Sequence, residues 1–116
     1  MSGEGVFPLV LEAGLGVDLH GEDSTKAARR AVQEAIRRVS FPGLAALLPG
    51  NDRANMRVRV TVAVPAAGSV RTDEVAAELP YGRVEVIAVE GGLRHPSGLE
   101  GGGDLIAAVA LIAVGW

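Results

Sequence analysis

A chain of 116 residues has room for one domain, residues 1–116, which is large enough to fold around its own core. It contains no cysteine, and this excludes disulfide bonds, thiolate metal sites and a cysteine nucleophile. The net charge of −3 and the aromatic content of 3% are unlike the basic excess and stacking side chains of nucleic-acid binders, so we expect no nucleic-acid partner.

No segment predicts a secretion signal or a membrane span. Residues 1–7 carry no basic region, and Glu12 interrupts the apolar run that follows Pro8. The longest apolar stretch, 105–114, has about half the length that a membrane-spanning helix needs. We therefore expect a cytoplasmic protein with no membrane partner, and the lack of cysteine fits a reducing compartment.

The first half of the chain predicts a strand, a loop and a helix. The branched apolar residues of 6–11 predict the strand, and the glycine-containing segment 12–23 predicts the loop. Residues 24–39 carry an apolar stripe at helical spacing, and either Asp23 or Ser24 can accept hydrogen bonds from the first turn as the N-cap.

The middle of the chain predicts two short helical segments around one strand. Residues 43–48 predict a single helical turn. Residues 57–64 form the clearest strand pattern, because every second residue is a valine. Residues 72–79 predict a short helix, whose first turn holds two acidic side chains where the helix dipole favours them.

The last part of the chain predicts two strands around a mobile loop. Residues 83–90 form the first of these strands, and 91–103 form the loop, which holds six of the sixteen glycines. The final strand, 105–114, is apolar on both faces, which is typical of a central or interface strand.

These elements predict an α+β fold, with a single four-stranded sheet, two helices on one face and the order β-α-β-α-β-β. The second face of such a sheet is left uncovered. Because the last strand is apolar on both faces and ends at Trp116, we expect the uncovered face to meet another subunit of the same protein.

Polar residues gather between Glu12 and Lys26. Glycines before a helix start can cradle an anion, but their spacing here matches neither the dinucleotide nor the P-loop pattern. Asp18 and His20 can share one side of an extended segment, either as metal ligands or as a base with its orienting carboxylate. They can equally be a turn aspartate and a hydrogen-bonded histidine. Two residues are no metal signature, so we assign no metal ligand and leave the cofactor unknown.

Two further positions are candidate site residues. Lys26 is the single lysine among ten arginines, which suggests a compact or titratable charge, unless it is an ordinary surface residue. Glu90 ends an apolar strand face directly before Gly91 and Gly92, where the backbone could approach a ligand closely, unless the strand has ended and Glu90 is solvated. Arg94, in the loop that follows, could close over such a ligand.

Two runs carry a resemblance to known proteins: Glu12-x-Gly14-x-Gly16-x-Asp18-Leu19-His20-Gly21-x-Asp23-x-Thr25-Lys26 and Val89-Glu90-Gly91-Gly92-Leu93. Together they resemble the "Lin" family of short bacterial conserved hypothetical proteins over nearly the whole chain, which implies no known activity. The Asp23-x-Thr25-Lys26 and Glu90-Gly91-Gly92 segments also resemble one repeat of the ring-opening amidohydrolases, cyanuric acid hydrolase and barbiturase. That resemblance implies a trimeric barrel of three copies with a central site, and Glu90 stands where that family has a serine.

From these observations we expect a homotrimer with a small-molecule site between subunits. Hydrolysis of a cyclic amide is the reaction that the second resemblance implies, with Glu90 or His20 as base and Lys26 stabilising charge. The ligand-binding residues would be Glu12, Asp18, Asp23, Gly91, Gly92 and Arg94. The alternative is a non-catalytic assembly or ligand-sensing module, in which the same residues cap the helix and pair across the interface. The residues alone do not decide whether the protein is an enzyme.

Overall fold

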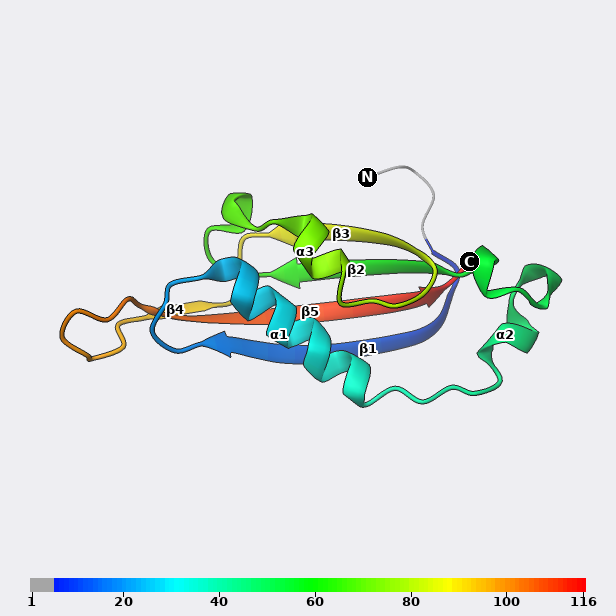
Figure 1. Ribbon diagram of the computed structural model, residues 1–116, viewed down its shortest axis with the longest axis horizontal. Coiled ribbons are helices and arrows are strands. Elements are labelled where there is room, and N and C mark those ends of the chain that lie inside the picture. The colour runs from blue at the N-terminus through cyan, green and yellow to red at the C-terminus, as the bar shows by residue number, and fades with distance from the viewer. Residues whose placement is uncertain (1–5) are drawn as a thin grey trace.

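The computed structural model describes residues 6–116, which fold into one mixed sheet with three α-helices (Figure 1). Its strands are β1 (Pro8–Asp18), β2 (Arg57–Ala63), β3 (Arg83–Val89), β4 (Leu93–His95) and β5 (Leu105–Gly115). Its helices are α1 (Ser24–Arg37), α2 (Leu44–Leu47) and α3 (Thr72–Ala76), with 3₁₀ turns at Pro49–Asn51, Arg53–Asn55 and Ala67–Ser69.

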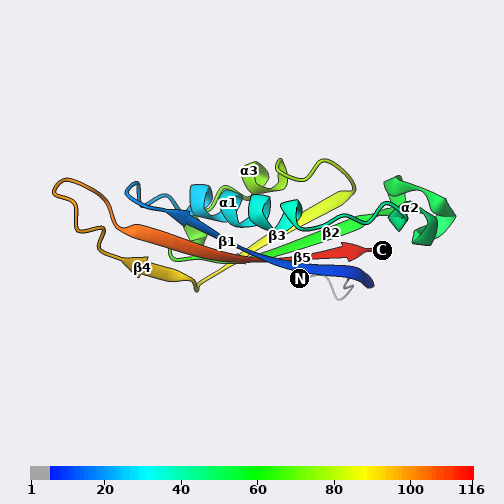
Figure 2. The same ribbon diagram turned by 90° about the horizontal axis from the view of Figure 1, so that it is seen from below.

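The sheet has the strand order β1-β5-β2-β3, and β4 also pairs with β5. The central strand β5 runs antiparallel to its neighbours, whereas β2 and β3 are parallel to each other. Helices α1 and α3 cover one face, while none of the helices formed by residues 6–116 lies on the other (Figure 2). We call this second face the open face. The fold therefore has two layers, a sheet and a helical layer.

The core lies between the sheet and α1. The alternating valines of β2 are buried on the helical side, as are the even-numbered residues of β5 from Ile106 to Ile112. They pack against the apolar stripe of α1, which includes Ala28 and Val32. The period of two along β2 thus confirms this strand as predicted, and the strand pairing places β5 between β1 and β2.

The segment after the first predicted strand is strand and not loop. Strand β1 continues to Asp18, and Leu11 to Asp18 pair residue by residue with β5. Its glycines serve the packing of α1, because a Cβ at Gly14 would lie 2.3 Å from the carbonyl oxygen of Ala31. At Gly16 a Cβ would lie 2.2 Å from the carbonyl oxygen of Ala27. The prediction of a loop over 12–23 was therefore wrong up to Asp18.

The start of α1 is confirmed. Asp23 is the N-cap, and its side chain accepts a hydrogen bond of 3.0 Å from the backbone N–H of Lys26. The helix ends at Arg37, before Val39, and α3 ends at Ala76, before Leu79. Both helices are shorter than predicted because their last residues enter irregular turns, which apolar spacing does not distinguish from helix.

The sheet has five strands, and the prediction of four was wrong. Strand β4 arises inside the segment predicted to be a mobile loop, 91–103, and pairs with the first residues of β5. Gly92 has a φ of +66°, and a Cβ there would lie 2.1 Å from the carbonyl oxygen of Ala107. The glycine thus lets the chain turn from β3 past the end of β2 and reach β5.

Helix α1 is also tied to the segment after α3 by Glu78. The Glu78 carboxylate accepts hydrogen bonds from Arg29 at 2.8 Å and from Gln33 at 3.1 Å. Burial raises the pKa of Glu78. The hydrogen bonds from Gln33 and Arg29 and the charge of Arg29 lower it, and together they outweigh burial, so the pKa is lower than that of an ordinary glutamate.

We predict that replacing Gly16 by alanine lowers the free energy of unfolding by about 3 kcal/mol, because α1 must move away from β1 to admit a methyl group. Gly68→Ala is the matched control, since a Cβ at Gly68 meets no atom within 4 Å. Urea unfolding of both variants measures the difference. Equal stabilities of the two variants would contradict the close contact.

We predict that Glu78 stabilises the fold at pH 7 and loses this effect as the pH falls. Its folded-state pKa is depressed, so its contribution is present above the ordinary glutamate pKa of about 4.3 and disappears as the pH falls through the folded value. Urea unfolding of the wild type and Glu78→Gln should therefore differ by about 1 kcal/mol at pH 7 and converge as the pH falls through the folded-state pKa. A difference that does not change with pH would show that the ion pair contributes nothing.

Candidate functional site

Asp18 organises the connection between β1 and α1. It is the last residue of β1 and only 4% exposed. One carboxylate oxygen accepts a hydrogen bond of 3.0 Å from the backbone N–H of Asp23, and the other lies 3.8 Å from the Lys26 ammonium group. Lys26 remains half exposed. Three of the predicted site residues are therefore brought together, and their contacts hold the start of α1 in place.

The adjacent residues Ser24 and Thr25 join this helix start to the segment after β2. The Ser24 hydroxyl donates to the carbonyl oxygen of Pro65 at 2.5 Å, and the Thr25 hydroxyl accepts from the backbone N–H of Arg71 at 3.0 Å. Both side chains are buried. The Arg71 guanidinium also donates a hydrogen bond to the Glu74 carboxylate, and this bond and the negative charge of Glu74 raise the pKa of Arg71.

Glu90 lies directly after the end of β3 and is exposed. Its carboxylate accepts a hydrogen bond of 2.7 Å from the backbone N–H of Ala67. Gly91 follows at a close approach to β2, since a Cβ there would lie 2.9 Å from the Cβ of Ala63. Glu90 and the two glycines after it thus fasten the loops at this end of the sheet.

A charged cluster joins the connection after β1 to the base of the β4–β5 hairpin. The Arg94 guanidinium lies 3.4 Å from the Glu22 carboxylate and 3.3 Å from that of Asp104. Glu22 also accepts a hydrogen bond from the backbone N–H of Asp104, and the carbonyl oxygen of His20 accepts one from Gly103. The His20 residue is exposed.

The remaining predicted residue, Glu12, lies in the middle of β1, 3.8 Å from Arg38. Across residues 6–116, no hydrogen bond or ion pair joins Glu90 to Lys26 or to His20, and no three His, Asp or Glu side chains are grouped to hold a metal ion. The predicted catalytic roles therefore stay predictions.

Two arginines, Arg30 in α1 and Arg38 directly after it, cover the outer edge of the sheet. Arg30 donates a hydrogen bond of 2.6 Å to the carbonyl oxygen of Val17, and Arg38 donates one of 3.3 Å to that of Ala13. These carbonyl groups belong to the edge strand β1, where unpaired backbone groups would otherwise invite another strand. Arg30 and Arg38 thus help to protect this edge.

The open face changes from apolar to charged along the strands. Register places Leu15, Val109, Ala63 and Val89 in one row across four strands, which we call the apolar row. Two rows further along, Leu11 and Ala113 continue into Arg59 and Glu85. The last row joins Gly115, Arg57 and Arg83.

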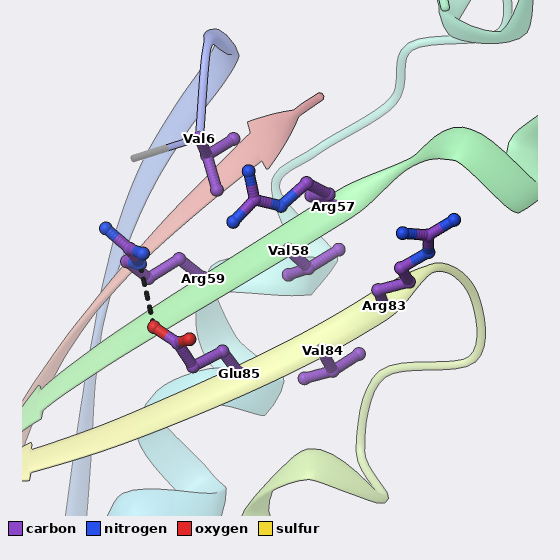
Figure 3. Close-up of a pocket in the computed structure, with 7 residues that line it drawn as sticks. All are labelled: Val6, Arg57, Val58, Arg59, Arg83, Val84 and Glu85. Atoms are coloured by element: carbon purple, nitrogen blue, oxygen red, sulfur yellow. Dashed lines mark hydrogen bonds and ion pairs between the residues drawn. The ribbon is translucent and has the colours of Figure 1, made fainter. Parts of the chain in front are cut away.

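A pocket of about 400 Å³ opens at the charged end of this face (Figure 3). We call it the arginine pocket; its lining residues are Val6, Arg57, Val58, Arg59, Arg83, Val84 and Glu85. Arg59 pairs with Glu85 across the two strands at 3.0 Å. The arginines of β2 were not among the predicted site residues, because the prediction of this strand used only its valine face. The signal that could have identified Arg57 and Arg59 is their alternation with the valines of β2, which places them on the opposite face of the strand.

A second, apolar cavity of about 210 Å³ lies between the end of α1 and the loops that carry Phe41 and Tyr81. The Arg53 guanidinium stacks over the Tyr81 ring at 5.0 Å from its centroid. None of the predicted site residues lines this cavity or the arginine pocket. Within residues 6–116, no helix has the length and apolar character required to cross a membrane.

We predict that Lys26 is energetically coupled to Asp18 and not to Glu90. In urea unfolding, the cycle of Asp18→Asn with Lys26→Gln should give a coupling of about 0.5 kcal/mol, as expected for a partly exposed ion pair. The cycle of Lys26→Gln with Glu90→Gln is the control and should be additive, because no contact joins the two side chains. Coupling between Lys26 and Glu90, with additivity between Lys26 and Asp18, would instead indicate that Lys26 and Glu90 share one site.

Comparison with known proteins agrees with the first resemblance found in the sequence. Residues 8–114 match the family described as "Conserved hypothetical protein (Lin0512_fam)". A solved structure of an FtsZ-like protein of unknown function from Nostoc punctiforme PCC 73102 is 34% identical, with a TM-score of 0.81 and 97% of each chain covered. A search of curated proteins found no match. The resemblance to ring-opening amidohydrolases stays a prediction. The chain belongs to the Lin0512_fam family of conserved hypothetical proteins.

Proposed function

We propose that this protein is a non-catalytic subunit of a homo-oligomer, which assembles through the open face of its sheet and holds a small molecule at the subunit junction. The observation that carries the proposal is the apolar row, which crosses four strands without a polar side chain. Leu15 and Val109, in this row, are 58% and 42% exposed, although β-sheet faces of this composition are usually covered.

Covering the open face would contribute a large free energy. Leu111 in the next row, Leu11 two rows away and Leu93 of β4 are also about half exposed. Burying the rest of each such side chain stabilises an assembly by about 1 kcal/mol. A specific interface buries in total about 1,000 Å² or more, so assembly would have to cover most of the open face.

A second copy of this chain is the occupant that fits best. An apolar row faces an identical row without leaving a charge unpaired, which makes the surface complementary to itself. Pairing through the β1 edge is disfavoured, because Arg30 and Arg38 already bond to two of its carbonyl groups, those of Val17 and Ala13. These contacts favour the open face over the β1 edge for assembly.

The arginine pocket supports a ligand at the subunit junction, because it lies on the same face as the apolar row. Its volume falls within the usual range of small-molecule sites. The separate engagement of Glu90 with Ala67 and of Lys26 with Asp18 favours binding without catalysis.

We predict that the wild-type protein is larger than its 11.9 kDa chain in solution at micromolar concentration and that Leu15→Glu is monomeric. A buried carboxylate in the apolar row would be left without a partner in the assembly. The homotrimer predicted from the sequence, three chains of 11.9 kDa, would have a mass of about 36 kDa. Light scattering coupled to size exclusion measures these masses.

Leu99→Glu is the matched control for this experiment. Leu99 is 54% exposed, close to the value for Leu15, but lies in the loop before β5 and away from the open face. The control should keep the wild-type mass. A monomeric wild type, or an equal loss of mass in both variants, would contradict assembly through the open face.

A further inference from the structure

We propose that the apolar cavity between the end of α1 and the loops of Phe41 and Tyr81 binds a small aromatic carboxylate. The ring of this ligand enters the cavity, and its carboxylate pairs with Arg53. The cavity is lined by Ile112 and Val114, even-numbered residues of β5, which belong to the helical side of the sheet. The inference therefore goes beyond the proposed function and does not depend on assembly through the open face.

The cavity has the size of one aromatic ring with a short substituent. Ile36 in the last turn of α1, Val58 in β2 and Leu79 after α3 help to line a volume of about 210 Å³. An apolar cavity of about 150 Å³ takes up a benzene molecule and stays free of water. A ring bound here would make van der Waals contacts on several sides.

The lining favours an aromatic ligand over an aliphatic one. Phe41 and Tyr81 both border the cavity and are 41% and 55% exposed, so a bound ring would cover part of each. Aromatic rings gain from stacked or edge-to-face contact with one another. The lining also contains the buried Met56, and a methionine sulfur makes favourable contacts with aromatic rings.

Arg53 supplies the charge at this cavity, whose other lining residues carry none. Its guanidinium lies over the Tyr81 ring, 5.0 Å from the centroid, and within residues 6–116 it has no hydrogen bond or ion pair. The ring contact keeps the guanidinium beside the cavity without neutralising it. The carboxylate of Asp52 accepts a hydrogen bond from the backbone N–H of Ala54 instead. The N–H donors of Arg53 can therefore receive an anion.

A carboxylate fits this single guanidinium better than a phosphate does. The guanidinium group matches the two oxygens of a carboxylate in a pair of parallel hydrogen bonds, and the two unit charges cancel. A phosphate group carries a charge of about −1.5 to −2, so part of it would stay uncompensated beside an apolar surface. The apolar lining thus selects the ring, and Arg53 selects the carboxylate.

The test is a methyl NMR titration with phenylacetate, with the neutral phenylacetamide as the matched probe. In the wild type, phenylacetate should shift the methyl signals of Met56, Ile112 and Val114 and leave those of Leu99, outside the cavity, in place. Arg53→Gln should weaken phenylacetate binding at least about tenfold, because it removes charge-assisted hydrogen bonds to the carboxylate. It should leave the weaker binding of phenylacetamide unchanged.

Arg37→Gln is the matched control, since it removes the same unit charge from an exposed position at the end of α1 that does not line the cavity. It should bind phenylacetate as the wild type does. Absence of phenylacetate binding to the wild type would overturn the inference. An equal weakening in Arg37→Gln and Arg53→Gln, or an equal loss of both probes in Arg53→Gln, would overturn it as well.

A second variant, Val39→Trp, distinguishes a ligand from a second copy of the chain as the occupant. Val39 lines the cavity and is 37% exposed, so a larger side chain there should take up part of the space and weaken the binding of both probes. Unchanged affinity in this variant would overturn the inference. If light scattering then showed an altered mass, the cavity would be assigned to contact between copies.

Discussion

The close contact between α1 and β1 is the constraint on which the rest of the structure depends. Gly14 and Gly16 leave no side chain between the strand and the helix, and the backbone of α1 fills that space. The contact fixes which residues of β1 face the helix, and so directs Leu11 and Leu15 to the open face. It also holds the start of α1 beside Asp18, which pairs with Lys26, and there Ser24 and Thr25 bond to the segment after β2.

A period of two along the strands divides the sheet into a face that packs on the helices and the open face. The even-numbered residues of β2 and β5 form the core with α1, whereas their odd-numbered residues form the rows of the open face. Because the register between strands is continuous, the apolar row and the arginine pocket follow from the same pairing. A shift of one residue in β2 would bury its arginines and expose its valines.

The sequence predicted most elements because their patterns are local. The valines of β2, the capped start of α1 at Asp23 and the two-sided β5 are each visible within a short window. Failures occurred where a distant segment decides the structure. The glycines of β1 have a turn-like composition until α1 is known to lie against them, and β4 exists only because β5 offers it a partner. The arginine pocket could not be predicted without the register of β2 with β3. Arg57 and Arg83 are far apart in sequence, and only this register makes them neighbours in space.

The proposal that the open face is an interface is tested most directly by methyl NMR with a soluble paramagnetic reagent. The reagent broadens the signals of methyl groups that it can reach. In the assembled protein, the methyl signals of Leu15, Val109 and Leu111 should stay sharp, while those of Leu99 broaden. Equal broadening of all four residues would show that the open face is in contact with solvent and would contradict the proposed assembly.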